Sequence, residues 1–490
     1  MYDTFIGLEV HIHLLTKTKL FCGCRSAFGD EPNTNICPVC MGYPGVLPAL
    51  NIEAMRMSCT VARALHCRIP ERTWFDRKQY FYPDMTKNYQ ISQFASPLGQ
   101  EGWVEIEGRN INKKIRIREC HLEEDAGKMV HTGTVSLLDY NRAGVSLLEI
   151  VTEPDMRSGE EAELFIQQLR RMVRYLGVCD GNMEEGSLRA DANISINISG
   201  AGLGRKVELK NLNSSRFVRL GLNYERERQA ALLDEGKTII QETRLWNENR
   251  DRTEPMRTKE NANDYRYFAE PDLPVFIPDE QFLAKVDAAL VELPLERLRR
   301  LKKEYGLNDE QADALCEEKA FADYFEETVK RIEGAEPKEC AQKAANWILG
   351  DIKHILSKEK IELNAISNFK LNASRLASII TMIIKGELSG KNAKQTALAV
   401  IAEDKEPAAI IELHGWAQIS DPEQVSLALQ AVCQKEAAAF AEAREAKAAG
   451  NEKRVATLSA FLTGKVLAET HGRANAEIAA KFVREKIAAT

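Results

Sequence analysis

Several features that would classify a protein at once are missing from this 490-residue sequence. No window approaches the ~18 uninterrupted apolar residues of a membrane span, and the N-terminus MYDTFIGLEV lacks the basic region and apolar core of a signal peptide. There is no Walker-type phosphate loop, no GxGxxG turn that opens a helix after a strand, and no serine or cysteine nucleophile motif in a recognisable context. The sequence therefore predicts a cytoplasmic protein without a membrane segment, whose function does not follow from a familiar nucleotide-binding motif.

The composition is that of an ordinary soluble protein, with 44% hydrophobic and 28% charged residues. A net charge of −7 excludes a globally basic nucleic-acid binder, although a local basic face is compatible with it. The 11 cysteines are an odd number in a chain predicted to be cytoplasmic, so we do not expect disulfides. The length predicts roughly three domains, because a single hydrophobic core does not grow to this size.

Four of the cysteines stand in two close pairs, CGC at 22–24 and CPVC at 37–40. Two pairs of thiolates on neighbouring turns suit tetrahedral zinc, and the loop between them is short enough to close around one ion. Four sulfur ligands leave no open position for a substrate, so the site would be structural. We predict a zinc ion bound by Cys22, Cys24, Cys37 and Cys40; the alternative is four small residues with no common role.

Residues 5–14, FIGLEVHIHL, alternate between apolar and polar side chains. This alternation predicts a strand with one buried face, and it places Glu9 and His11 next to each other on the other face. A carboxylate and an imidazole side by side can hold one metal ion. The alternative is a solvated strand face that carries polar residues without a ligand.

A second predicted strand, LLEIV at 147–151, contains a single carboxylate, Glu149, within an apolar run. An unpaired carboxylate in a buried strand would cost on the order of several kcal/mol, so Glu149 requires a cation. Two kinds of cation fit the sequence. One is a metal ion, and the other is a nearby arginine such as Arg142.

Residues 187–198, SLRADANISINI, alternate in the same way, and a glycine-rich turn leads from them into KVELKNL at 206–212. The pattern predicts a hairpin whose polar side carries Asp191 and Glu208 as candidate functional residues. Solvated surface charges are the alternative.

Residues 74–93, WFDRKQYFYPDMTKNYQISQ, interleave aromatic and basic side chains. In a loop, such a mixture can hold a nucleotide base or a terminal adenosine. The alternative is that the aromatic side chains at 80–82 only pack against their neighbours. The candidate nucleotide ligands are basic and aromatic residues of this segment and of the predicted hairpin, namely Lys78, Tyr82 and Arg189.

The character of the sequence changes near residue 290. From there to about residue 404, and again from 405 to 490, helical patterns replace strand patterns. The last segment is rich in alanine and mixes basic with acidic side chains, which fits either a contact with nucleic acid or a solvated helix face. The predicted domains are 1–290, 291–404 and 405–490.

Over almost its whole length the chain resembles one family, the GatB family, which comprises the B subunits of aspartyl/glutamyl-tRNA amidotransferases. The motifs that carry the resemblance are, in chain order, GLEVHIHL, YPGVLPALN, FDRKQYFYPD, YQISQF, HLEEDAGK, LLEIVTEPD, MEEGSLRADANISI, ELKNLNS, QETR and DYRYFAEPDLP. Part of the family lacks the four paired cysteines, so zinc would be the trait of a subgroup.

The resemblance implies an α+β fold. A β-rich cradle domain with the active site would occupy 1–290, followed by an all-α helical domain over 291–404 and an all-α, YqeY-like, tRNA-binding tail over 405–490. It also implies a heterotrimer (GatCAB) with an amidase partner, which releases ammonia from glutamine, and a small third partner. The B subunit would phosphorylate, with ATP, the side-chain carboxyl of misacylated Glu-tRNA(Gln) or Asp-tRNA(Asn). Ammonia would then displace phosphate, which makes the enzyme a carbon–nitrogen ligase of translation.

Phosphoryl transfer of this kind requires Mg2+, which hard oxygen ligands hold. By the resemblance, the family's Mg2+ site falls on three residues that would also be the catalytic ones: His11, Glu124 and Glu149. Further ligands, or residues just behind them, would be Glu9, Asp191 and Glu208. The imidazole is a softer ligand than Mg2+ prefers, which leaves room for Mn2+.

A rival hypothesis of another class is a non-catalytic, zinc-containing scaffold that binds tRNA. It would explain the paired cysteines and the basic side chains of the tail. It would not explain carboxylates on several strands.

Overall fold

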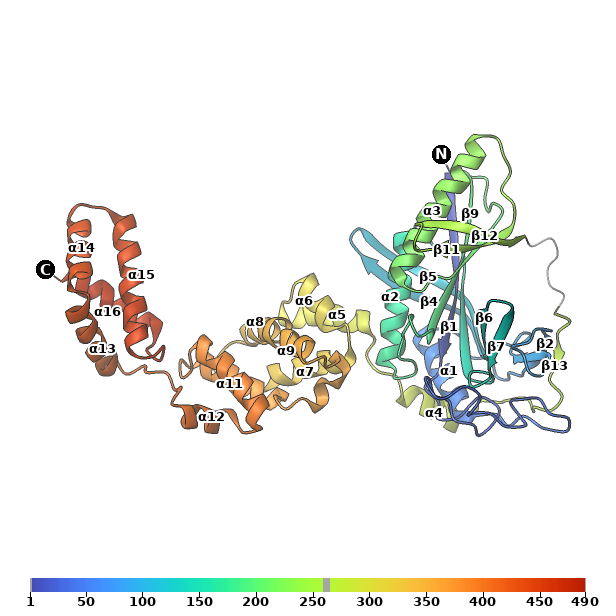
Figure 1. Ribbon diagram of the computed structural model, residues 1–490, viewed down its shortest axis with the longest axis horizontal. Coiled ribbons are helices and arrows are strands. Elements are labelled where there is room, and N and C mark those ends of the chain that lie inside the picture. Colours follow the sequence, from blue (N-terminus) through green and yellow to red (C-terminus); the bar gives the residue numbers. More distant parts are fainter. Residues whose placement is uncertain (1, 259–264, 490) are drawn as a thin grey trace. The chain divides into compact units, whose positions relative to one another are not determined.

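The structure is a computed structural model that describes residues 2–258 and 265–489 of the chain. The chain divides into two compact units, Met1–Leu295 and Glu296–Thr490. The first unit combines a large sheet with helices, whereas the described elements of the second are helical (Figure 1). The predicted fold class, α+β with a β-rich part followed by all-α parts, is confirmed.

An eleven-stranded sheet organises the described part of the first unit, in the order β12-β11-β10-β9-β1-β8-β5-β3-β2-β13, with β4 paired to β5 outside this path. Strand β1 lies between β9 and β8, both antiparallel to it. The strands are β1 (Tyr2–His13), β2 (Asp76–Gln79), β3 (Tyr89–Ser92), β4 (Gly99–Gly108), β5 (Ile111–Glu124), β8 (Ser146–Thr152), β9 (Leu188–Ile198), β10 (Val207–Lys210), β11 (Glu242–Asn247), β12 (Arg252–Thr258) and β13 (Phe268–Ala269).

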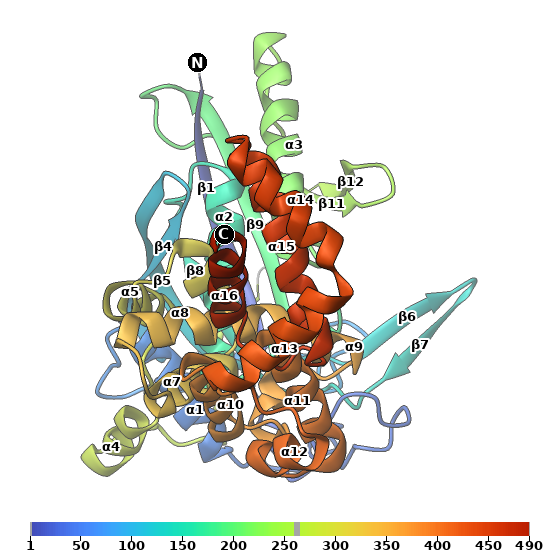
Figure 2. The same cartoon turned by 90° about the vertical axis from the view of Figure 1, so that its left-hand side faces the viewer.

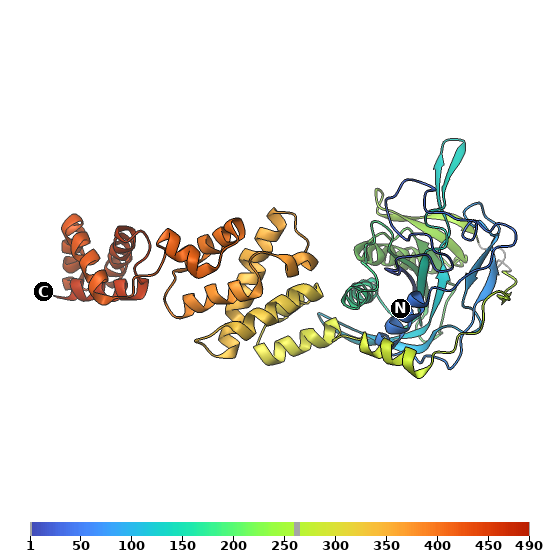
Figure 3. The same cartoon turned by 90° about the horizontal axis from the view of Figure 1, so that it is seen from below.

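Two further strands form a separate hairpin, β6 (Lys128–Thr132) and β7 (Val135–Asp139). The hairpin projects away from the rest of its unit in both side views (Figures 2 and 3).

Three helices pack on one face of the large sheet: α1 (Ile52–Ala64), α2 (Gly159–Tyr175) and α3 (Ser215–Asp234) (Figure 1). A fourth, α4 (Glu280–Ala288), packs against α1. Each of the three begins at a residue whose side chain accepts amide hydrogen bonds, Asn51, Ser158 and Ser214.

The hydrophobic core lies between these helices and the sheet. On β1, Leu8, Val10 and Ile12 are fully buried in this core. Because side chains alternate along a strand, Glu9 and His11 point to the opposite face, as predicted from the sequence. That face is therefore where polar chemistry can be placed.

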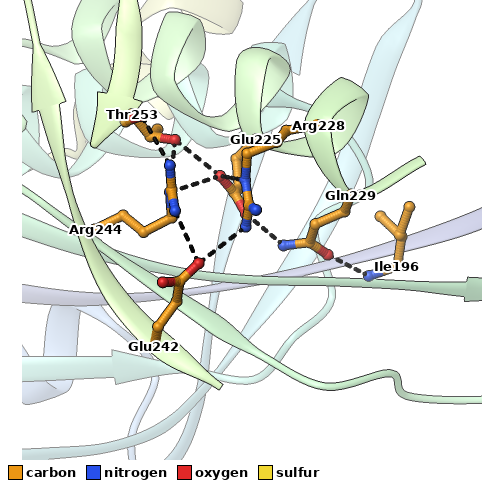
Figure 4. A network of polar contacts seen from close by, with 7 residues as sticks. All are labelled: Ile196, Glu225, Arg228, Gln229, Glu242, Arg244 and Thr253. Atoms are coloured by element: carbon orange, nitrogen blue, oxygen red, sulfur yellow. Dashed lines mark hydrogen bonds and ion pairs between the residues drawn. The ribbon is translucent and has the colours of Figure 1, made fainter. Parts of the chain in front are cut away.

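A buried polar network connects α3 to β11 and β12 at one edge of the sheet (Figure 4). The Glu225 carboxylate, on α3, receives hydrogen bonds from Arg228, Gln229 and Thr253, and the guanidinium of Arg244 lies 3.5 Å from it. Glu225 and Gln229 are both fully buried. A buried charge is tolerated only when it is paired and hydrogen-bonded, and this network meets that condition.

We expect Gln229→Leu to destabilise the first unit by about 1–3 kcal/mol. Its Nε2 donates to Glu225 over 2.9 Å, and its Oε1 accepts from the Ile196 amide over 3.2 Å, so leucine would leave two buried groups short of a partner. Glu227→Gln, an exposed change two residues away on the same helix, is the control and should stay within about 0.5 kcal/mol. Thermal and urea melts of both variants measure the difference, and equal melts would show that the network adds no stability.

The second unit contains twelve described α-helices, beginning with α5 at the junction of the two units: α5 (Pro294–Tyr305), α6 (Asp309–Leu315), α7 (Lys319–Arg331), α8 (Pro337–Trp347), α9 (Lys353–Lys358), α10 (Ala373–Ile384), α11 (Gly390–Glu403), α12 (Pro407–His414), α13 (Pro422–Lys435), α14 (Ala437–Ala448), α15 (Glu452–Glu469) and α16 (Ala476–Ala488). Their buried residues form two separate cores, one from Leu301 to Ile411 and one from Val425 to Ile487. Across the described residues, no helix has both the length and the apolar character needed to cross a membrane.

Candidate active site

A row of titratable side chains crosses the central strands on the face of the sheet that the helices leave uncovered. In the antiparallel register, His11 of β1 is paired with Glu149 of β8, and Glu149 is paired in turn with His121 of β5. On its other side, His11 is paired with Arg189 of β9. Directly paired residues point to the same face of a sheet, so these four side chains are neighbours.

Glu149 lies between two imidazoles. Its Oε2 atom is 3.4 Å from Nε2 of His11 and 3.2 Å from Nε2 of His121, and the same His121 nitrogen is 3.8 Å from Oε2 of Glu123. Burial would raise the pKa of Glu149, but His11 and His121 hold it well below its ordinary value. Burial would lower the pKa of His121, yet Glu123 and Glu149 raise it to about 10. The site therefore concentrates charge in a buried position.

Potential ligand atoms of His11, Glu123 and Glu149 all lie within 4.8 Å of one another. We call these three residues the central cluster. Two carboxylates and one imidazole form a donor set that fits a divalent cation of the Mg2+ or Mn2+ type.

Glu123 takes the place that was predicted for Glu124. Side chains alternate at the end of β5, so Glu124 shares the helix-covered face with Leu122, while Glu123 points to the face of the site. The Glu124 carboxylate is paired with the ammonium of Lys87 and accepts a 2.9 Å hydrogen bond from the amide of Ile91. The structure does not bring Glu124 to His11 and Glu149.

Three further carboxylates form a second group, which we call the acidic cluster: Glu9, Asp191 and Glu208, with ligand atoms within 4.8 Å of one another. The Nζ atom of Lys210 lies 2.5 Å from Asp191 and 3.2 Å from Glu208. Burial raises the pKa of Glu9, and the negative charges of Glu149, Asp191 and Glu208 raise it further. The three predicted residues are thus gathered beside the central cluster as a group of their own.

A buried carboxylate, Asp125, holds the arginine at the edge of the site. Its Oδ2 atom lies 2.7 Å from Nε2 of His13 and accepts a 3.0 Å hydrogen bond from the guanidinium of Arg189. The Arg142 guanidinium is 3.5 Å from Asp125 and donates to two backbone carbonyls of the adjoining loop. The cations next to Glu149 are therefore the two histidines rather than Arg142.

His11 and Glu123 of the central cluster and Asp191 of the acidic cluster line one cavity of about 750 Å3. Its wall combines acidic side chains of both clusters with four lysine or arginine side chains, Lys78, Lys128, Arg189 and Lys210. Two of the predicted nucleotide ligands, Lys78 and Arg189, therefore line the site. The third, Tyr82, is 49% exposed and lies outside the lining of this cavity, where Tyr80 is found instead.

The four paired cysteines come together as predicted, with the sulfur atoms of Cys22, Cys24, Cys37 and Cys40 within 4.8 Å of one another. The surroundings favour a thiolate at Cys40. A hydrogen bond from Cys22, the amide of Cys37 and the buried ammonium of Lys19 together lower the pKa of Cys40 to about 4. Four sulfur atoms in this arrangement are compatible with a structural zinc ion.

Glu123, His121 and Lys210 were not identified as site residues from the sequence. A strand pattern extended through HLEE at 121–124 would have put His121 and Glu123 on one face and Glu124 on the other. That pattern was obscured because β5 has an irregular register between Ile117 and Glu119, which interrupts the alternation.

Comparison with known proteins assigns a class to both units. A family model described as the GatB/GatE catalytic domain matches residues 4–284, and a second one described as the GatB domain matches residues 323–487. The first match contains the central cluster, the acidic cluster and the four paired cysteines. The chain therefore consists of a GatB/GatE catalytic domain followed by a GatB domain.

Curated relatives match along the whole chain. The B subunit of the aspartyl/glutamyl-tRNA(Asn/Gln) amidotransferase of Thermosynechococcus vestitus is 45% identical over 500 residues, which cover 99% of this chain and 96% of that protein. The protein of the same name from Thermodesulfovibrio yellowstonii is 44% identical over 484 residues, which cover 98% of each chain. The chain belongs to the family of aspartyl/glutamyl-tRNA(Asn/Gln) amidotransferase B subunits.

Proposed function

We propose that this chain catalyses the ATP-dependent amidation of misacylated Glu-tRNA(Gln), Asp-tRNA(Asn) or both. The observation that carries the proposal is the central cluster, because two carboxylates and an imidazole meet there at a cavity bordered by Lys78 and Arg189. Negative ligands for a divalent cation next to basic side chains for phosphate oxygens are the parts that phosphoryl transfer needs.

The proposed chemistry solves a leaving-group problem. A carboxylate is a poor acyl donor because it would have to expel oxide. Phosphorylation of the side-chain carboxyl by ATP gives an acyl phosphate, and attack by ammonia on its carbonyl carbon then releases inorganic phosphate and forms the amide. A bound Mg2+ would neutralise charge on the phosphate oxygens, and His11, Glu123 and Glu149 are the residues that would hold it.

The chain's own basic residues would orient the nucleotide. Lys78 and Arg189 can donate hydrogen bonds to phosphate oxygens, and Asp125 fixes Arg189 for this task through the 3.0 Å hydrogen bond. The acidic cluster offers a place for a further cation, and Lys210 already balances part of its charge. Glu124 has a structural role in this account, because its charge is matched by Lys87.

The nitrogen donor is supplied by a partner in this proposal. The chain would act in the cytoplasm within the GatCAB heterotrimer, in which the amidase partner releases ammonia from glutamine and the small third partner completes the assembly. The four paired cysteines would hold a structural zinc ion apart from the reaction, since all four ligand positions are taken by sulfur.

The proposed function is tested by measuring whether ATP consumption depends on misacylated tRNA. The same measurement distinguishes an enzyme from a non-catalytic scaffold. The complex purified through this chain should hydrolyse ATP at a basal rate with correctly charged tRNA and faster with Glu-tRNA(Gln) or Asp-tRNA(Asn). A scaffold would bind both tRNAs and leave ATP untouched. Testing each misacylated tRNA alone also identifies the substrate.

Removal of the tail should weaken tRNA binding without damaging the active site. Because Ile410 and Ile411 of α12 are buried in the first helical core, the deletion should cover residues 420–490 and spare α12. We expect a higher apparent KM for tRNA, a shallower dependence of tRNA affinity on salt, and unchanged glutamine hydrolysis by the complex. Unchanged affinity and salt dependence would show that the tail does not contact tRNA.

A further inference from the structure

Three aromatic rings contact one another in a row at the edge of the first unit, and we call them the ring ladder: Phe94, Tyr267 and Tyr265. The rings of Phe94 and Tyr267 are stacked, with centroids 3.9 Å apart and an angle of 7° between their planes. Tyr265 meets Tyr267 edge to face, with centroids 6.1 Å apart. The loop that presents Phe94 is held in place by the buried carboxylate of Asp76, which accepts the amide of Phe94 over 3.0 Å and the next amide over 2.9 Å.

The segment that carries the two tyrosines has two distinct faces. Tyr265 and Tyr267 belong to the ring ladder, whereas Phe268 lies on the other side, with the guanidinium of Arg77 5.8 Å from its ring. Phe268 is 50% exposed and belongs to β13, which is paired with β2. It therefore offers a matched control, an aromatic ring of similar exposure outside the ladder.

The ring ladder leads into the candidate active site. The Nζ atom of Lys78 lies 5.0 Å from the ring centroid of Tyr265, and both residues line the cavity that contains Glu123.

The outer end of the ladder is open to solvent. Phe94 is 59% exposed although one of its faces is covered by Tyr267. A fixed, exposed ring that continues a stack, with a cation beside its inner end, is the arrangement on which proteins stack unpaired bases.

We propose that the ring ladder stacks the base of the 3′-terminal adenosine of the misacylated tRNA. This inference rests on the proposed function and adds the place where the end of the tRNA is held. An aminoacyl group is esterified to the ribose of that adenosine, so stacking its base on the ladder directs the side-chain carboxyl toward the central cluster. We assign the ladder to the tRNA end rather than to the adenine of ATP because its outer end is open to solvent. The rest of the tRNA continues outside the cavity, so its terminal base needs a binding place that solvent can reach.

The test uses a tRNA whose terminal adenine is replaced by 2-aminopurine, whose fluorescence is quenched by stacking. Quenching should occur when the assembled complex binds this tRNA, and it should be lost in Phe94→Ala, with affinity about 5- to 150-fold weaker. Phe268→Ala should quench like the wild type. A tRNA that lacks the terminal adenosine should bind the wild type and Phe94→Ala equally.

Three results would overturn the inference: quenching unchanged in Phe94→Ala, quenching lost equally in Phe268→Ala, or quenching of 2-aminopurine riboside triphosphate that disappears in Phe94→Ala. The last result would assign the ladder to the nucleotide. Failure of the proposed function is seen separately, because the fluorescence signal reports binding. A complex that quenches the probe but consumes no ATP with misacylated tRNA would refute the function and leave the ladder in place.

Discussion

Replacing Glu123 by glutamine should slow phosphorylation of the misacylated tRNA, with a fall of about 10²–10³-fold in the rate of acyl-phosphate formation. The substitution keeps the shape of the side chain and removes one negative charge from the central cluster, where Glu123, His11 and Glu149 lie within ligand distance of one another. A divalent cation would be held more weakly, and the charge that develops on the transferred phosphate would be less well neutralised. The binding of tRNA and the glutaminase activity of the complex should be retained.

Glu124→Gln is the matched control, because it makes the same chemical change at the neighbouring residue on the opposite face of the strand. This variant should melt at a lower temperature, since it leaves the buried ammonium of Lys87 without its charged partner. Its folded fraction should phosphorylate the tRNA at a rate close to the wild type. If Glu124→Gln lost phosphorylation and Glu123→Gln kept it, the assignment of the central cluster would be refuted.

The second large effect concerns zinc. The purified chain should contain about one zinc ion, and Cys37→Ser should reduce this to none, because structural sites of four thiolates are lost when one ligand is removed. Apparent binding free energies of about 10–16 kcal/mol are known for structural zinc in small peptides, so the segment from 22 to 40 should become sensitive to protease without the ion. Elemental analysis and limited proteolysis measure the two consequences.

Cys433→Ser is the control for the zinc experiment, because this partly buried cysteine packs against the last helical core, away from the paired cysteines in the sequence. It should leave both the zinc content and the protease pattern unchanged. Wild-type protein purified without chelators that contains no zinc, with four free thiols at the paired positions, would contradict the prediction.

Local patterns were sufficient to predict the elements that build the site. Alternation in FIGLEVHIHL predicted β1 with Glu9 and His11 on its polar face, and alternation in SLRADANISINI predicted β9, which pairs with β10 as an antiparallel neighbour. The spacing of the cysteines predicted which four would meet. In each case the information is contained in a period of two or in a short loop, and it does not depend on distant contacts.

Contacts across the sheet were not predictable in the same way. The pairing of Glu149 with both His11 and His121 depends on the register of three strands that are far apart in the sequence. Whether Glu123 or Glu124 points into the site depends on the strand register after the irregularity in β5. A shift of the register by one residue would exchange the faces of the sheet to which the two side chains point. The ring ladder joins Phe94 to Tyr267 across more than 170 positions of the sequence, which no local pattern records.

The most direct test of the central claim follows the oxygen atoms of the substrate. Glu-tRNA(Gln) with 18O in its side-chain carboxyl is incubated with the complex, ATP and glutamine, and the inorganic phosphate is analysed by mass spectrometry. If the carboxylate attacks the γ-phosphate and ammonia then displaces phosphate, one 18O atom should appear in phosphate for each amide formed. Formation of Gln-tRNA(Gln) with no 18O in phosphate would contradict the account.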